Sequence, residues 1–179
     1  SRSLLNSPRT IAIGTARQPH STIAHQIMLS DGQEHKDKLL IALLQQGDFN
    51  RTLVFANKRS TAVRLAGLLK YHKLRCDCLH GEMSTEDRRQ VVTRFNDGKL
   101  SVLCASDVAA RGIDIKDVRH VVNHDVPERP EDYVHRNGRT ARAGAGGTAI
   151  TLQCIDEGYV LKDIERLIGI EIERRDVEG

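Results

Sequence analysis

The sequence predicts an α/β fold, with an open, mostly parallel, doubly wound sheet and helices on both faces. Two observations lead to this prediction. Short β-rich runs alternate with helical patterns along most of the chain. Strand runs such as TLVF, VLCA and AITL are apolar on both faces, which is typical of parallel strands covered on two sides.

The predicted elements follow one another in strict alternation. Strands are expected at 23–29, 52–55, 76–79, 102–105, 120–123 and 148–153. Helices are expected at 34–46, 60–71, from residue 84 onward, at 131–142 and at 157–168. Ser84, with Asp87 three residues later, forms the capping pattern that starts a helix, and a Gly-containing loop follows the strand at 102–105.

The 179 residues are enough for one domain with a proper core. Residues 1–21 contain Pro8, Gly14 and Pro19 and show no sustained period, so they are expected to be a linker that enters the domain from upstream. The domain itself is expected at 22–170, with 171–179 as a C-terminal tail.

Composition limits the function classes without selecting one. The net charge of +3 permits a phosphate-binding face but also fits many other proteins. With 3% aromatic residues and no Trp, contact with nucleic acid by a row of stacked rings is disfavoured, and backbone contacts are favoured. The four cysteines lack paired zinc-ligand spacing and are expected to be free thiols. Because no apolar stretch approaches the roughly 20 residues of a membrane span, a cytoplasmic protein that binds no membrane is expected.

In a doubly wound sheet, ligands bind outside the carboxyl ends of the strands. The segments that follow the predicted strands are FANKRS, LHGEMS, CASDVAARGID and NHDVPERP. They hold much of the polar and glycine content of the chain, so the chemistry is sought there.

Three arginines lie in YVHRNGRTARAG at 136, 139 and 142. Three residues along a helix turn a side chain by about 60° less than a full circle, so Arg139 and Arg142 can converge on one object. Two planar guanidinium groups suit a triphosphate. The alternative is a solvated basic helix face, but the glycines at 138, 144, 146 and 147 would weaken such a helix.

A second polar segment, SDVAARGID, directly follows an apolar strand. Ser106 could hold a phosphate, Gly112 allows a close turn, and Asp114 could accept a ribose hydroxyl. The structural alternative is that Ser106 and the aspartates are caps and turn formers, and that Asp107 and Arg111 form an ion pair within the loop.

These two segments closely resemble motifs V and VI of the DEAD-box helicases of superfamily 2. TLVFANKRS and LHGEMSTEDRR look like motifs IV and IVa, so four motifs occur in the order and spacing of the family. The resemblance runs from about His25 to Ile168. It implies a RecA-like domain, related to the P-loop NTPases but lacking its own phosphate loop.

The resemblance also implies roles for individual residues. Arg139 and Arg142 would be arginine fingers on the γ-phosphate, and Asp114 would bind the ATP ribose. His135, Arg136, Asp107 and Arg111 would couple the ATP site to the interface with the other domain. The RNA backbone would be held by Gly81, Arg88, Ser106 and Lys58.

Some positions depart from the pattern of the family. Lys58 and Ser106 stand where Thr is usual, and Thr85 stands where Gln is expected. Asn137 replaces an apolar residue and Ala141 a glycine. Both of these changes preserve the register of the arginines.

The chain contains neither a G-x-x-x-x-G-K-[ST] loop nor an Asp-Glu-Ala-Asp sequence. ATP with Mg²⁺ would therefore be held chiefly by an N-terminal RecA-like domain of the same protein, and the fragment alone is expected to be a monomer without ATPase activity. Two alternatives remain open: a superfamily 2 translocase acting on DNA, and a non-catalytic RNA-binding or regulatory module with this fold. A metal site is not expected, because no histidine pair has a convincing ligand spacing.

Overall fold

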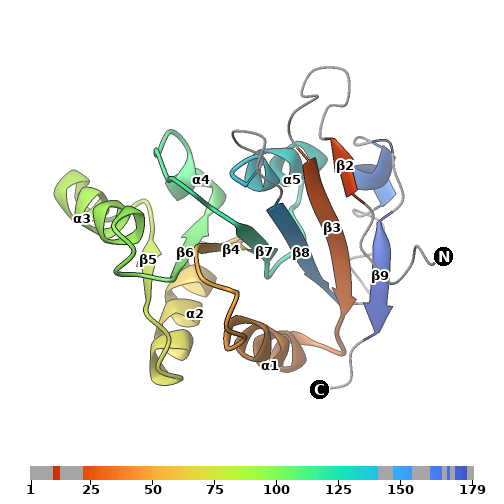
Figure 1. The fold of residues 1–179 in the computed structure, drawn as a ribbon, viewed down its shortest axis with the longest axis horizontal. Helices are drawn as coiled ribbons and strands as arrows, with labels where there is room; N and C mark the ends of the chain where they lie inside the picture. Colours follow the sequence, from red (N-terminus) through yellow and green to blue (C-terminus); the bar gives the residue numbers. More distant parts are fainter. Residues whose placement is uncertain are drawn as a thin grey trace.

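A computed structural model describes residues 10–12, 22–140, 147–154, 162–166, 169 and 172–176. The described strands form one eight-stranded sheet (Figure 1), in the order β2-β3-β8-β7-β4-β6-β5, with β9 also pairing with β3. The strands are β2 (Thr10–Ala12), β3 (Thr22–Leu29), β4 (Thr52–Ala56), β5 (Cys76–Leu79), β6 (Val102–Ser106), β7 (His120–Asn123), β8 (Gly147–Gln153) and β9 (Glu173–Asp176). The pairing of β2 with β3 is antiparallel and the other pairings are parallel. The predicted mostly parallel sheet is confirmed.

Helices cover both faces of the sheet. Those with described bounds are α1 (Gln33–Leu44), α2 (Arg59–Tyr71), α3 (Thr85–Asn96), α4 (Asp107–Ala110) and α5 (Pro130–Asn137). Residues 162–166, within the helix predicted at 157–168, are also helical. Val54 and Ala56 of β4 pack in one cluster with leucines of α1 and α2, whereas Leu53 and Phe55 pack in another with α3 and α4. Alternate residues of one strand thus face two helical layers, which confirms the doubly wound prediction.

The sequence placed most elements to within two residues, but one helix ends early. A helix was expected at 131–142, whereas α5 ends at Asn137. Beyond it the chain makes tighter turns, because the amides of Arg139 and Thr140 donate to the carbonyls three residues before them. The Thr140 hydroxyl also donates to the carbonyls of Val118 and Arg119, which fixes the chain beside β7.

Three described elements were not foreseen. The short helix α4 begins where a loop was expected, because the Ser106 side chain accepts from the Ala109 amide at 3.4 Å. The strands β2 and β9 lie in segments that were expected to be linker and tail. Both pair with β3, which puts backbone partners along the outer edge of that strand.

The cysteine side chains of β5 and β6 pack as small hydrophobic residues. Cys76, Cys78 and Cys104 are buried in the same core cluster as residues of α2, and all three are free thiols, as expected. Within the described ranges, no helix is long and apolar enough to cross a bilayer.

Candidate functional site

The carboxyl ends of the strands border a surface hollow of about 480 Å³, called here the first hollow. It is lined by Phe55, Asp107, Ala110, Arg111, Asp132, Val134, His135, Arg136, Gly138 and Arg139. Helix α4 directly follows β6, and α5 follows the loop after β7, so parallel strands deliver both helices to one edge. Five predicted site residues, Asp107, Arg111, His135, Arg136 and Arg139, therefore meet at this hollow.

Arg136 is held at the base of the first hollow and is only 1% exposed. Its guanidinium donates to both Asp107 carboxylate oxygens at 2.7 and 2.8 Å, and to Asn57 Oδ1 at 2.7 Å. Two further hydrogen bonds reach Asn123 Oδ1 at 3.3 Å and the Asp125 carbonyl at 2.8 Å. These five bonds use the full donor capacity of a guanidinium, so Arg136 ties α5 to α4 and to the ends of β4 and β7.

Asp107 thus pairs with Arg136. The alternative pair of Asp107 with Arg111 is wrong for this structure, in which Arg111 is exposed and lines the hollow. Both carboxylate oxygens of Asp107 accept from the Arg136 guanidinium, so this carboxylate already has its partner.

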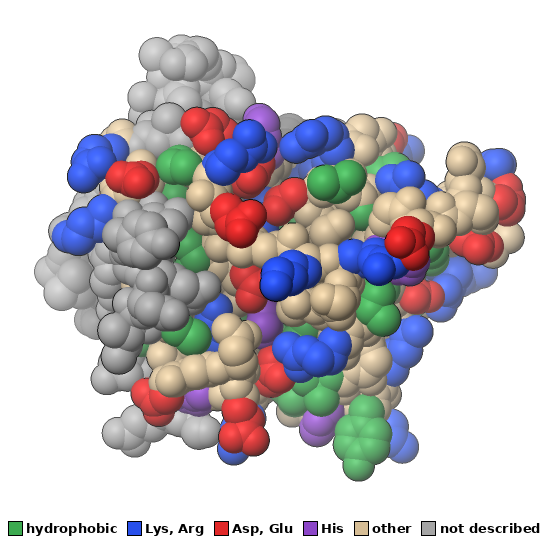
Figure 2. All heavy atoms as spheres, turned by 180° about the vertical axis from the view of Figure 1, so that it is seen from behind, with side chains coloured by type: hydrophobic (Ala, Val, Ile, Leu, Met, Phe, Trp, Pro, Cys, Tyr) green, Lys and Arg blue, Asp and Glu red, His purple; other side chains and the backbone are tan. Residues whose placement is uncertain are grey.

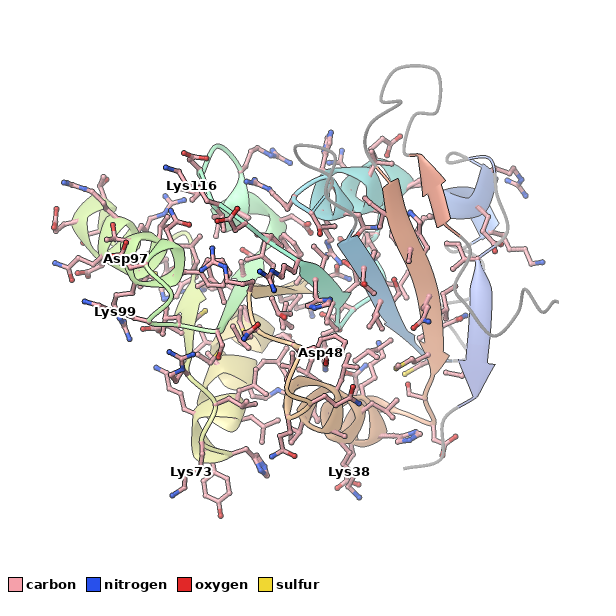
Figure 3. The ribbon with its side chains drawn as sticks, viewed as in Figure 1. Lys38, Asp48, Lys73, Asp97, Lys99 and Lys116 are labelled. Atoms are coloured by element: carbon pink, nitrogen blue, oxygen red, sulfur yellow. The ribbon has the colours of Figure 1, made fainter. Side chains whose placement is uncertain are left out.

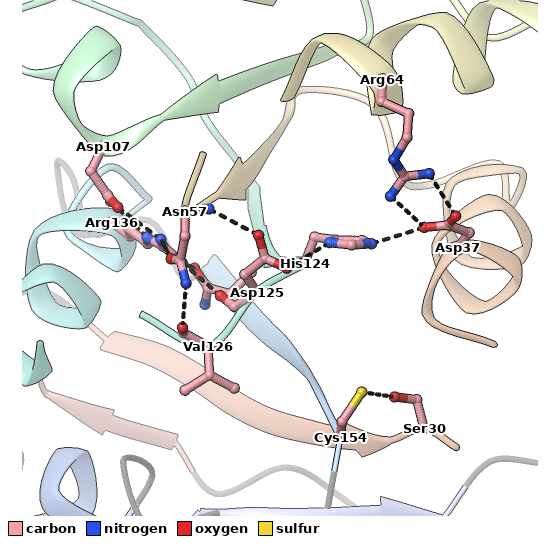
Figure 4. Close-up of polar contacts among 11 residues, drawn as sticks. Ser30, Asp37, Asn57, Arg64, Asp107, His124, Asp125, Val126, Arg136 and Cys154 are labelled. Atoms are coloured by element: carbon pink, nitrogen blue, oxygen red, sulfur yellow. Dashed lines mark hydrogen bonds and ion pairs between the residues drawn. The ribbon is translucent and has the colours of Figure 1, made fainter. Parts of the chain in front are cut away.

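A polar chain behind Arg136 was missed by the sequence analysis (Figure 4). The Asn57 amide donates to Asp125 Oδ2 at 2.9 Å, and Asp125 Oδ1 lies 3.0 Å from His124 Nδ1. The other ring nitrogen, His124 Nε2, lies 2.9 Å from Asp37 Oδ1 on α1, and Arg64 of α2 binds the same carboxylate. The only sequence signal was the position of NHDVPERP after a predicted strand.

The electrostatics of this chain favour ionised carboxylates. Burial raises the pKa of Asp125, but the hydrogen bond and charge of His124, the Asn57 amide and the charge of Lys36 outweigh it and bring the pKa to about 2. Burial likewise raises the pKa of Asp37, and hydrogen bonds from Arg64 and His124 bring it below its ordinary value. The two aspartates are therefore anions at neutral pH.

Arg139 lies in the turn after α5, not on the predicted helix. Its guanidinium donates to the Ile113 carbonyl at 2.6 Å and to the Ala110 carbonyl, so it bridges the rim of the first hollow to the loop after α4. Because α5 ends at Asn137, before Arg139, the helical spacing used to pair Arg139 with Arg142 stays a prediction. Arg142 lies outside the described residues.

The loop after α4 depends on two small residues. Ser106 is buried and its hydroxyl caps α4, which supports the structural alternative for this residue. Gly112 has φ +75°, a left-handed conformation that glycine adopts at little cost. This agrees with the close turn that was expected at this glycine.

A second hollow of about 280 Å³ lies between α3 and the same loop. It is lined by Thr85, Arg88, Arg89, Val92, Thr93, Gly112, Ile113 and Asp114. Arg88 donates to the Ala109 carbonyl at 2.9 Å, which fixes α3 against α4. Asp114, the predicted ribose ligand, therefore lines the hollow that holds Arg88, while Arg139 reaches the neighbouring Ile113 from the first hollow.

The remaining predicted residues, Lys58 and Gly81, are exposed and line neither hollow. Lys58 precedes α2 as its N-cap, and the next residue, Arg59, forms an ion pair with Glu82, beside Gly81. This ion pair brings the two segments together.

Charges outside the two hollows form a mixed surface. Lys38, Lys73 and Lys99 project into solvent (Figure 3), and on the rear face basic and acidic side chains are interspersed (Figure 2). The mild net charge is therefore not concentrated in one dominant basic patch on that face.

Residues 35–144 match the sequence family described as the helicase conserved C-terminal domain. The structure also superposes on the E. coli DEAD-box protein SrmB, crystallised with regulator of ribonuclease activity A, with a TM-score of 0.80 and 42% identity over 85% of this chain and 89% of that one. The chain is a helicase C-terminal domain of the DEAD-box family. This confirms the resemblance carried by the four motifs.

Other DEAD-box proteins show how much of a helicase this domain represents. The ATP-dependent RNA helicase SrmB of E. coli K12 is 38% identical over 175 residues, which are 98% of this chain but 39% of that protein. The S. cerevisiae Dbp5 structure bound to RNA and ADP BeF3 matches with a TM-score of 0.77 and 32% identity, over 86% of this chain and 41% of that one. The helicase C-terminal domain thus spans about two fifths of these relatives.

Proposed function

We propose that this domain is the C-terminal half of an ATP-dependent RNA helicase, which completes ATP hydrolysis and holds RNA together with an N-terminal RecA-like domain. The observation that carries the proposal is the first hollow, where Arg139 and the buried Arg136–Asp107 pair meet at the carboxyl edge of the sheet. Relatives that are 38% identical to this chain are named as ATP-dependent RNA helicases.

Arg139 is proposed to act as an arginine finger, together with Arg142. Its guanidinium is half-buried at the rim of the hollow and bound to the carbonyls of Ala110 and Ile113. Carbonyl oxygens hold a guanidinium more weakly than a phosphate does, because a phosphate carries full negative charge. A triphosphate presented by the companion domain could therefore draw Arg139 from the loop, and its charge would stabilise the transition state.

Asp114 and the coupling residues are proposed to support that step. Asp114 would accept a hydrogen bond from the ATP ribose, next to the Ile113 carbonyl that now holds Arg139. His135 and Arg111 are exposed at the first hollow, where a companion domain could contact them. The residues of this domain hold no Mg²⁺-binding loop, so ATP and Mg²⁺ would be held chiefly by the companion domain.

RNA is proposed to lie along the α3 side of the same edge. Arg88 lines the second hollow, and Gly81 and Lys58 are exposed nearby, joined by the Arg59–Glu82 ion pair. Ser106 would contribute by capping α4 and so shaping the loop. Contacts of this kind reach sugar and phosphate and carry no sequence information, which fits the low aromatic content.

The test is RNA-stimulated ATPase activity of the full-length protein with Arg139→Ala. We expect turnover to fall by roughly 10³-fold, as for loss of an arginine finger. Arg75→Ala is the matched control, because Arg75 also donates to two backbone carbonyls, Gly98 and Lys99, but lies outside both hollows. Unchanged turnover in Arg139→Ala would favour the non-catalytic module, and equal stimulation by DNA would favour the DNA translocase.

A further inference from the structure

His124 occupies an unusual position for a histidine, fully buried between two carboxylates. The side chain is 0% exposed, and its backbone amide donates to the Phe55 carbonyl at 2.9 Å, which fixes it at the end of β7. Nδ1 lies 3.0 Å from Asp125 Oδ1, and Nε2 lies 2.9 Å from Asp37 Oδ1. Both ring nitrogens are therefore within hydrogen-bond distance of a carboxylate oxygen.

A neutral imidazole cannot satisfy this arrangement. It has one N–H donor and one lone pair, and an ionised carboxylate only accepts. One of the two contacts would then set a nitrogen lone pair against a carboxylate oxygen, inside the protein where such repulsion is poorly screened. The imidazolium ion donates from both nitrogens and satisfies both carboxylates.

Each aspartate is itself anchored, so neither can turn away easily. Asp37 accepts two hydrogen bonds from Arg64, and Asp125 accepts one from the backbone amide of Asn57. The pKa values of both carboxyls are below their ordinary values, after burial is opposed by these partners and by His124. A shared proton held on a carboxyl is thereby disfavoured.

We propose that His124 is held as an imidazolium ion and that its charge positions Arg136 through Asp125 and Asn57. The path has three steps. His124 binds the Asp125 carboxylate, and this carboxylate accepts a hydrogen bond from the backbone amide of Asn57. The Asn57 side-chain oxygen and the Asp125 carbonyl then both accept hydrogen bonds from Arg136. His124 does not contact the first hollow, so it is a positioning residue and not a catalytic one. The consequence for turnover rests on the proposed function.

Charged groups from α1, α2, α5 and the loop after β7 surround His124. They are Asp37 and buried Lys36 of α1, Arg64 of α2, Asp125 in the loop after β7, and Arg136 of α5. The cations oppose a further positive charge, but the two carboxylates contact the ring directly. Loss of the ring proton would remove one donor, release one carboxylate and loosen the alignment of Arg136.

The direct test is NMR of this chain at neutral pH, observing the ring nitrogens of His124 and the Nε–H resonance of Arg136. We expect both ring nitrogens to be protonated. Asp37→Asn should lower the protonated fraction, because one stabilising anion is gone, and the Arg136 resonance should shift with it. A single protonated nitrogen in the wild type, a protonated fraction unchanged by Asp37→Asn, or an Arg136 resonance unmoved by loss of that proton would each overturn the proposal.

The second test is RNA-stimulated ATPase activity of the full-length protein. His124→Gln should lower turnover about tenfold at neutral pH, within the range for a displaced active-site group. His72→Gln, at the end of α2 and outside the chain of contacts, is the control. Turnover in His124→Gln equal to that of the wild type would refute the role. A silent Arg139→Ala variant, together with the expected NMR result, would refute the proposed function alone.

Discussion

Replacing Arg136 with Met should destabilise the domain strongly, because the structure makes this guanidinium the centre of a buried network. Met fills most of the same volume but donates nothing, so Asp107, Asn57 and Asn123 lose partners. Breaking a buried ion pair by removing one partner costs about 3–5 kcal/mol. The Asp107 side chain is 22% exposed and can recruit water, so we expect the lower end, about 3 kcal/mol. That is a large share of the roughly 5–15 kcal/mol that stabilises a typical domain.

The assay is urea unfolding of the chain, followed by circular dichroism. Arg94→Met is the matched control, since Arg94 binds Asp77 at the same 2.8 Å and Asp77 is 24% exposed, but the Arg94 side chain is 47% exposed. A solvated pair of this kind contributes about 1 kcal/mol or less. Equal destabilisation by the two substitutions would refute the reasoning, because burial of the guanidinium would then carry no special cost.

Three further predictions concern stability. Burial lowers the pKa of His25 from 6.5 to about 4, so the contribution of neutral His25 to the free energy of unfolding is complete above pH 6.5 and is lost as pH falls toward 4. About 2 kcal/mol of stability should be lost between about pH 7 and 5. In urea unfolding, His25→Phe should flatten this pH dependence. Gly112→Ala should cost about 1 kcal/mol by the same measurement, since φ is +75° and no atom lies near the added methyl group; no loss would contradict the left-handed loop. Ser84→Ala should cost about 1 kcal/mol, because the Ser84 hydroxyl accepts from the Asp87 amide at 3.0 Å; an unchanged unfolding midpoint would exclude that cap.

Most of the fold could be predicted from periodicity, and the failures have local causes. The apolar strand runs identified β4, β6 and β8 because both faces of each strand are covered, which leaves a continuous hydrophobic signal. The end of α5 was missed because Arg139 to Arg142 continue a helical pattern, while the stop comes from Thr140 bonding to distant carbonyls. The strand β9, ERRD, has no β-rich signal and forms by pairing with β3.

The candidate site was predicted by position more than by partner. Five of the predicted residues do meet at the first hollow, because the parallel topology sends the ends of β6 and β7 to the same edge. What sequence could not give was the pairing. Asp107 is 29 residues from Arg136, and Asp37 is 87 residues from His124, and no local pattern links residues so far apart in the chain.

Two arginines three residues apart have different fates, and this difference explains how the site works as proposed. Arg136 lies in the last turn of α5, where its side chain enters the network and every donor is used. Arg139 lies beyond the helix end, half-buried at the rim, where it binds carbonyls of a loop. A residue with five internal bonds is costly to move, whereas one held by carbonyls can exchange them for a phosphate. The end of α5 at Asn137 thus leaves Arg136 inside the network and places Arg139 at the rim of the first hollow, where the proposed transfer to a phosphate would take place.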